Sequence, residues 1–109
     1  MNGIKTWNIE ELCGYKPTTT FYEDFSIADK FGTNAIKDTY KRAFEGAKSL
    51  GYKYLTELVL ALNWKIWEHY ERGNELIATL YDSLWKRLDL WCVDNLKNDE
   101  LRYYYRTID

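Results

Sequence analysis

The sequence predicts an all-α protein: a compact bundle of three or four long helices, with a short helical element at each end, in one domain that spans residues 1–109. Two observations predict this class. Apolar residues recur every three or four positions, and no segment of useful length alternates between apolar and polar residues with the period of a strand. Glycines also stand where successive periodic segments end, at Gly14, Gly32, Gly51 and Gly73. The short connections favour antiparallel packing of consecutive helices.

The N-terminal part carries one short helical signal. Asn8 followed three residues later by Glu11 is a capping-box pattern, and a glycine comes soon after, so we expect a single helical turn over Ile9–Cys13. The only proline, Pro17, indicates a connecting loop over residues 15–19.

The next two segments each have a start signal, an apolar face and a glycine stop. Thr20 and Glu23 form a second capping box, and the helix that follows has these apolar residues at helical spacing: Phe21, Phe25, Ala28 and Phe31. Thr33 or Asn34 can cap the following helix, which we expect to end at Gly51. Its apolar face consists of Ile36, Tyr40, Ala43, Phe44 and Ala47.

The stretch Tyr52–Arg72 is apolar around most of its circumference. One side carries Leu55, Leu58, Val59, Leu62, Ile66 and Tyr70, and a narrow polar stripe on the other carries Glu57, Lys65, Glu68 and Arg72. The apolar surface is extended sideways by Leu60, Trp64 and Trp67. A helix this apolar normally contacts neighbours on two sides, so we expect it to be the central helix of the bundle.

Two helices are predicted beyond this central segment. Asn74 can cap a helix that runs to about Lys97, with an apolar row of Ile77, Leu80, Leu84, Leu88 and Trp91. Asn98 can cap a short last helix over Asp99–Arg106.

Composition favours a cytoplasmic protein. The N-terminus lacks the apolar core of a signal peptide, and no apolar run approaches the ~20 residues of a membrane span. Cys13 and Cys92 have neither metal nor redox spacing and fit a reducing compartment, although a disulfide between them is an alternative. We expect no membrane partner and no cofactor.

No pattern in the sequence indicates an enzyme. His69 is the only histidine, no candidate nucleophile or orienting partner accompanies it, and a metal site would have to recruit scattered carboxylates. Paired carboxylates fall at expected helix starts, where they complement the helix dipole, and phosphate-binding glycine loops are absent. We therefore expect no catalytic residue and no metal ligand.

The surplus of aromatic residues suggests a protein-binding surface. Aromatics make up 17% of the chain, which is more than a core this small needs, and tyrosine, tryptophan and arginine are the usual hot-spot residues of interfaces. The candidate partner-binding residues are Trp64, Trp67, Arg102, Tyr103, Tyr104 and Arg106. For each group of candidates, a packing role stays open as the alternative to partner binding. The last helix would then be pinned to the core by Leu101, Tyr104 and Tyr105, and the Trp64–Trp67 edge would be covered by Trp85 and Trp91.

Two other functions remain as alternatives. Residues 26–42 resemble a degenerate helix-turn-helix, whose phosphate contacts would be Lys37, Lys41 and Lys48, although its apolar positions are out of phase and the net charge is -2. An aromatic pocket at Trp64, Trp67, Trp85 or residues 103–105 would instead suit a small-molecule or nucleotide sponge.

Four segments carry a family resemblance. Thr20–Gly32, Ala35–Phe44, Tyr52–Trp67 and Tyr105–Asp109 resemble small uncharacterised proteins carried by phages and mobile elements of gut bacteria. The resemblance implies a cytoplasmic accessory protein and supplies no residue roles. Small phage proteins without enzymatic motifs often block a host target, so it implies a protein that binds a host protein, such as an inhibitor of a defence enzyme like a CRISPR nuclease. Homo-oligomerisation is a further possibility.

Overall fold

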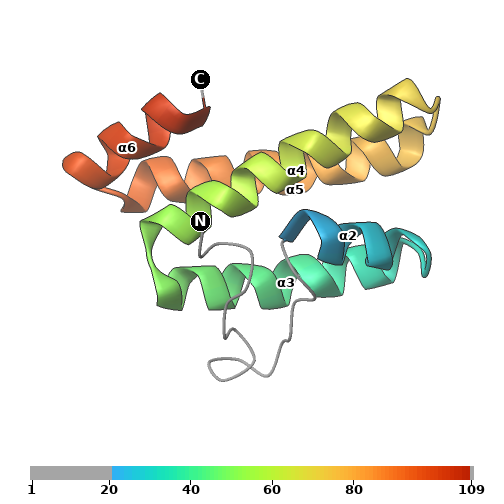
Figure 1. The fold of residues 1–109 in the computed structure, drawn as a ribbon, viewed down its shortest axis with the longest axis horizontal. Helices are drawn as coiled ribbons and strands as arrows, with labels where there is room; N and C mark the ends of the chain where they lie inside the picture. Colours follow the sequence, from blue (N-terminus) through green and yellow to red (C-terminus); the bar gives the residue numbers. More distant parts are fainter. Residues whose placement is uncertain (1–20, 109) are drawn as a thin grey trace.

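A computed structural model of the chain describes residues 21–108 (Figure 1). These residues form five helices and no strand, which confirms the all-α class. The helices are α2 (Phe21–Asp29), α3 (Thr33–Leu50), α4 (Tyr52–Glu71), α5 (Glu75–Asn95) and α6 (Asp99–Ile108). The expected turn over Ile9–Cys13, the loop around Pro17 and the Thr20 cap lie outside the described residues.

Helix α4 is the centre of the bundle, as its apolar circumference predicts. It contacts α2, α3, α5 and α6, and it runs beside α5 for most of its length (Figure 1). Its most completely buried apolar side chains are Leu55, Leu58, Val59 and Leu62, each at most 2% exposed. A single helix that faces several neighbours needs apolar residues on more than one side, and that is what the pattern supplies.

The junction between α3 and α4 consists of one residue, Gly51. Its φ of 122° lies in a region that L side chains rarely adopt, which explains a glycine here. The Gly51 amide donates to the carbonyl oxygen of Ala47, and the Gly51 carbonyl accepts from the amides of Tyr54 and Leu55. The same residue therefore closes one helix and opens the next.

The starts of α3 and α5 agree with the sequence, but the side-chain caps expected for these two helices do not form. Gly32 occupies the N-cap of α3, so neither Thr33 nor Asn34 caps it. Asn74 is the N-cap of α5, yet its side chain makes no capping hydrogen bond because its amide lies against the ring of His69 instead.

Three side chains lie on a different side from the one that the periodicity predicts. Phe31 is 75% exposed, because α2 ends at Asp29 and the chain turns before the next helical position is reached. Tyr70 is also exposed. Lys65, which was expected in the polar stripe of α4, is fully buried, because α2 packs against that stripe.

The last helix is attached to the core by Tyr104. This side chain is fully buried, and its hydroxyl donates a hydrogen bond to Asp89 of α5. The neighbouring Tyr103 packs edge-on against Tyr52 of α4, with ring centroids 5.3 Å apart.

Two further expectations are answered by the described residues. Cys92 is a buried free thiol whose pKa burial raises to about 12, so it acts as a small apolar residue and the disulfide alternative is not observed. Between residues 21 and 108, no helix combines the length and the apolar character that crossing a membrane requires.

Candidate functional site

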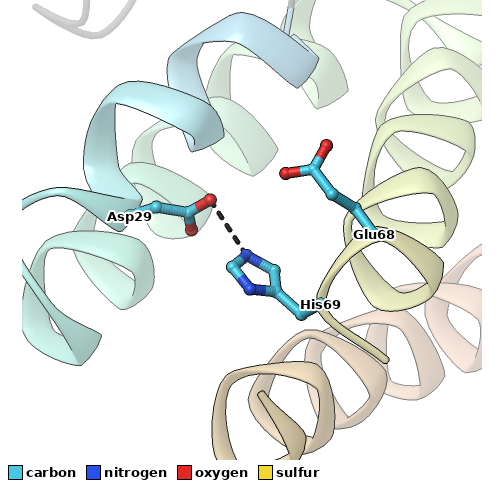
Figure 2. A group of neighbouring side chains, drawn as sticks. All are labelled: Asp29, Glu68 and His69. Carbon is cyan, nitrogen blue, oxygen red and sulfur yellow. Dashed lines mark hydrogen bonds and ion pairs between the residues drawn. The ribbon is translucent and has the colours of Figure 1, made fainter. Parts of the chain in front are cut away.

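Three helices bring together a group of polar side chains that the sequence keeps far apart. We call it the Lys65 cluster; its members are Tyr22, Ser26 and Asp29 from α2, Lys65, Glu68 and His69 from α4, and Tyr81 from α5. Figure 2 shows the Asp29 carboxylate pointing across the gap between α2 and α4 toward the His69 ring, with Glu68 alongside.

The ammonium group of Lys65 is at the centre of this cluster. It donates to Asp29 Oδ2 at 2.7 Å, to Glu68 Oε2 at 2.8 Å and to Ser26 Oγ at 3.0 Å. These three acceptors match the three hydrogens of an ammonium group. The nitrogen also lies 4.9 Å from the centroid of the Tyr22 ring, whose face attracts cations. A fully buried charge is tolerated here because every one of its hydrogens has a partner.

The imidazole of His69 has a defined partner on each side. Its Nε2 lies 2.9 Å from Asp29 Oδ2, and its Nδ1 lies 3.5 Å from the amide nitrogen of Asn74. Since the Asp29 carboxylate can only accept a hydrogen bond, Nε2 of His69 is the donor in their contact. The ring stacks on Tyr81, with centroids 5.6 Å apart and planes 17° apart. The only histidine is thus held in place from three directions.

Each of the two carboxylates in the cluster also accepts a hydrogen bond from a tyrosine hydroxyl. Tyr81 donates to Asp29 Oδ1 at 2.5 Å, and Tyr22 donates to Glu68. Burial would raise the pKa of the Glu68 carboxyl, but hydrogen bonds from Lys65 and Tyr22 and the nearby charges outweigh it and lower the pKa overall. Glu68 also pairs at 3.4 Å with Arg72, the surface ion pair expected from their spacing.

The cluster contains a serine beside a lysine, a pair that serves as nucleophile and base in some hydrolases. The directions of the hydrogen bonds oppose that chemistry here. Ser26 donates its proton to the carbonyl oxygen of Tyr22, while Lys65 donates to Ser26 and is held by two carboxylates. Because Lys65 acts as a donor, it is not placed to remove the serine proton.

Asp29, Glu68 and His69 also have the composition of a metal site. One ligand atom from each lies within 4.8 Å of the other two. However, the Lys65 ammonium already lies between the two carboxylates, and a divalent cation beside it would meet a like charge and lose ligands to it. The arrangement therefore fits an internal ion-pair network better than a metal centre.

Alkaline pH is expected to unfold the protein through its buried phenols. Burial raises the pKa of Tyr81, with a further contribution from its hydrogen bond to Asp29, and burial raises that of Tyr40 to about 12 and that of Tyr104 as well. The stability that these neutral phenols contribute is fully present below pH 10, the ordinary tyrosine pKa. It is lost as pH rises through the raised pKa values of the buried tyrosines, because the tyrosines of the unfolded chain ionise first.

Absorbance at 295 nm, recorded alongside far-UV circular dichroism from pH 8 to 13, tests this expectation. The buried tyrosines should ionise only as the helix signal is lost. Ionisation of all tyrosines near pH 10 with intact helices would contradict it.

The predicted partner-binding tryptophans lie at the surface. Trp64 is 66% exposed and Trp67 is 60% exposed, and neither is covered by the tryptophans of α5. Trp91 packs instead edge-on against Phe44, with centroids 5.3 Å apart. Beside Trp64 and Trp67 is a shallow hollow of about 440 Å³, which is also lined by Tyr22, Asn63, Glu68 and Glu71.

The C-terminal candidates are divided between surface and core. Arg102 and Arg106 are exposed, and Arg102 pairs with Asp99 at 3.0 Å. Tyr103 is half-buried against α4, and Tyr104 is fully buried. The prediction that Tyr104 contacts a partner is therefore corrected: its ring fills the core beneath α6. These four residues do not form one continuous exposed patch.

The three lysines of the nucleic-acid alternative also have different surroundings. Lys37 and Lys41 line a groove between α3 and α5. Lys48 pairs with Glu45 at 3.1 Å and lies 4.5 Å from the centroid of the Phe44 ring. Of these three lysines, only Lys37 and Lys41 line the same groove.

Sequence reasoning missed the Lys65 cluster. Lys65 and His69 in a largely apolar helix were visible signals, but their partners on α2 were not: Asp29 and His69 are 40 positions apart, and Ser26 and Lys65 are 39 apart. No protein-family model, curated protein or solved structure matches this chain, so its geometry carries the functional argument.

Proposed function

We propose that this chain is a non-enzymatic binding protein that recognises another protein through the exposed aromatic side of α4. The observation that carries the proposal is the exposure of Trp64 and Trp67, at 66% and 60%, beside a hollow. We call this the Trp surface; it consists of Tyr22, Asn63, Trp64, Trp67, Glu68 and Glu71.

Two neighbouring exposed tryptophans are unusual on a surface that contacts only water. Tryptophan is the residue most enriched among interface hot spots, because it removes a large apolar area from water while losing few rotamers. A hollow next to the rings also gives a partner side chain a place to insert.

The Lys65 cluster supports this surface from below. Tyr22 and Glu68 belong to both, and the hydrogen bond that Tyr22 of α2 donates to Glu68 of α4 holds the two helices together. A surface whose supporting side chains are already ordered loses less conformational entropy when it binds. The network therefore contributes to recognition by holding the Trp surface in one arrangement.

The charges at the edge indicate what kind of partner fits. Glu68 and Glu71 line the hollow, so a complementary surface would present apolar side chains flanked by lysine or arginine. The resemblance to small proteins of phages and mobile elements points to a cytoplasmic host protein, and inhibition of a defence enzyme such as a CRISPR nuclease is consistent with this mode of action.

Alanine at both Trp64 and Trp67 is expected to abolish partner capture without unfolding the protein. Hot-spot truncations cost about 2 kcal/mol or more each, which is roughly thirtyfold in affinity. Leu90→Ala is the matched control, because Leu90 is a 64% exposed apolar residue on α5, outside the Trp surface. Quantitative affinity capture from bacterial lysate, with melting temperatures measured in parallel, compares the three proteins.

The proposal is supported if a protein is retained by the wild type and Leu90→Ala and is lost from the double variant. Sedimentation of the purified chain shows whether a second copy is the partner, in which case the tryptophan changes dissolve the oligomer. Equal recovery of every captured protein by the wild type and both variants, with no self-association, would rule out the Trp surface as a binding site.

A further inference from the structure

A second hollow lies on different helices, between α3 and α5. It has a volume of about 800 Å³, within the range of small-molecule sites. We call it the α3–α5 groove. The argument rests on six of its lining residues, which are Lys37, Tyr40, Lys41, Phe44, Arg87 and Trp91.

The groove has three cationic side chains that form no ion pair with any acidic residue of the described part of the chain. Lys37, Lys41 and Arg87 are exposed, and within residues 21–108 none of them forms an ion pair. Their neighbours on the same helices do: Arg42 pairs with Asp38 at 3.3 Å, and Lys86 pairs with Asp82 at 3.0 Å. Positive charge is therefore left uncompensated along the groove, although the chain as a whole is slightly acidic.

The wall of the groove contains a buried hydroxyl that has no hydrogen-bond partner among the described residues. Tyr40 is 5% exposed, and its hydroxyl makes no hydrogen bond to any described residue. Burial raises the pKa of Tyr40 to about 12, so the group keeps its proton at neutral pH and remains a donor. Buried donors are nearly always paired in folded proteins, and an acceptor bound in the groove would supply the missing partner.

Aromatic rings form another part of the wall. The rings of Tyr40 and Phe44 lie nearly parallel, with centroids 5.8 Å apart, and Trp91 stands edge-on to Phe44. Phe44 and Trp91 are only half-buried, so part of each ring is open to the groove. Such surfaces accept planar ligands by stacking or edge-on contact.

We infer that the α3–α5 groove binds a mononucleotide, with its phosphate near Lys37, Lys41 and Arg87, and its base against Phe44 and Trp91. The Tyr40 hydroxyl donates to an oxygen of the ligand. Uncompensated cations, an unpaired buried donor and an aromatic wall are together the complement of a phosphate joined to a planar ring. A polynucleotide would need a longer basic track than these three cations supply.

Isothermal titration calorimetry with AMP, adenosine, inorganic phosphate and a decameric oligoadenylate tests the inference on the full chain. AMP should bind, and adenosine and phosphate should each bind at least about tenfold more weakly, because each reaches only part of the groove. No heat or thermal stabilisation with millimolar AMP overturns the inference. Equal affinity for adenosine and AMP also overturns the inference. So does a result in which the decamer binds and AMP does not.

Two variants locate the site. Tyr40→Phe should weaken AMP binding about tenfold or more, since a hydrogen bond to a charged group is lost, while the melting temperature stays the same or rises because an unpaired buried hydroxyl is removed. Lys41→Gln, at an exposed position, should weaken AMP binding without affecting folding.

Lys86→Gln is the control, with the same charge change on α5 outside the groove, and should bind like the wild type. Unchanged AMP affinity in both Tyr40→Phe and Lys41→Gln would overturn the assignment. Because this groove and the Trp surface share no residue, failure of one test leaves the other proposal intact.

Discussion

Replacing Lys65 with methionine is expected to lower the free energy of unfolding by about 3–5 kcal/mol, the range measured when one member of a buried ion pair is removed. Methionine keeps most of the side-chain volume, so the loss comes from charge rather than from a cavity. Asp29 and Glu68 would lose the ammonium between them and retain two neighbouring negative charges. Urea unfolding followed by far-UV circular dichroism measures the change.

Lys86→Met is the matched control for this substitution. Lys86 also makes an ion pair, with Asp82 at 3.0 Å, but its side chain is 68% exposed, so its loss should cost less than about 1 kcal/mol. Adding Asp29→Asn to Lys65→Met should recover part of the lost stability, because it removes one of the stranded charges. If Lys65→Met and Lys86→Met unfold at the same urea concentration, the Lys65 ammonium is not a buried part of the fold.

A large effect at Lys65 would also bear on recognition. Lys65 has hydrogen-bond partners on both helices, since Asp29 and Ser26 come from α2 and Glu68 comes from α4. The cluster thereby holds α2 at one position along α4. Because Tyr22 and Glu68 line the Trp surface as well, loss of the cluster is expected to disorder the surface that we propose for partner binding.

Tyr104→Ala is the second change with a large expected effect, about 3–5 kcal/mol of stability, as for other buried aromatic residues truncated to alanine. Its ring is fully buried and its hydroxyl donates to Asp89, so the change leaves a cavity and removes a hydrogen bond of α5. The adjacent Tyr105 is 44% exposed, and Tyr105→Ala should cost less than about 1 kcal/mol.

Urea unfolding compares the two tyrosine variants, and limited trypsin digestion at Arg102 and Arg106 reports on α6 directly. Faster cleavage in Tyr104→Ala than in Tyr105→Ala would show that Tyr104 holds this helix in place. The opposite pattern, in which Tyr104→Ala keeps its stability but loses a partner, would restore the partner-binding role that the sequence suggested for Tyr104.

The positions of the helices along the chain could be predicted, because helix formation depends on residues that are close together in the sequence. An apolar residue every three or four positions, ended by a glycine, specifies a helix whatever it packs against. This is why the bounds of α3 and α4 match the glycine positions closely, and why α4 could be identified as central. Capping was less predictable. The Asn74 side chain contacts His69 and does not cap α5, because the turn between α4 and α5 brings these two residues together.

The candidate site was only partly predictable, because periodicity does not state which neighbour covers a given side of a helix. Trp64 and Trp67 extend the apolar surface of α4, and the sequence left open whether α5 covers them; in the structure they are exposed. Lys65 stands on the polar stripe of the same helix, yet α2 covers it and supplies its partners.

The sequence by itself therefore determined the all-α class, the helices of the described chain and the central place of α4, since these follow from patterns within about 20 residues. Only the tertiary structure decided that Lys65 of the polar stripe is buried, that the tryptophan edge is open, and that Tyr40 lies in a basic groove. The physical reason is that burial and pairing depend on contacts between residues some 40 positions apart, and those contacts exist only once the helices have packed.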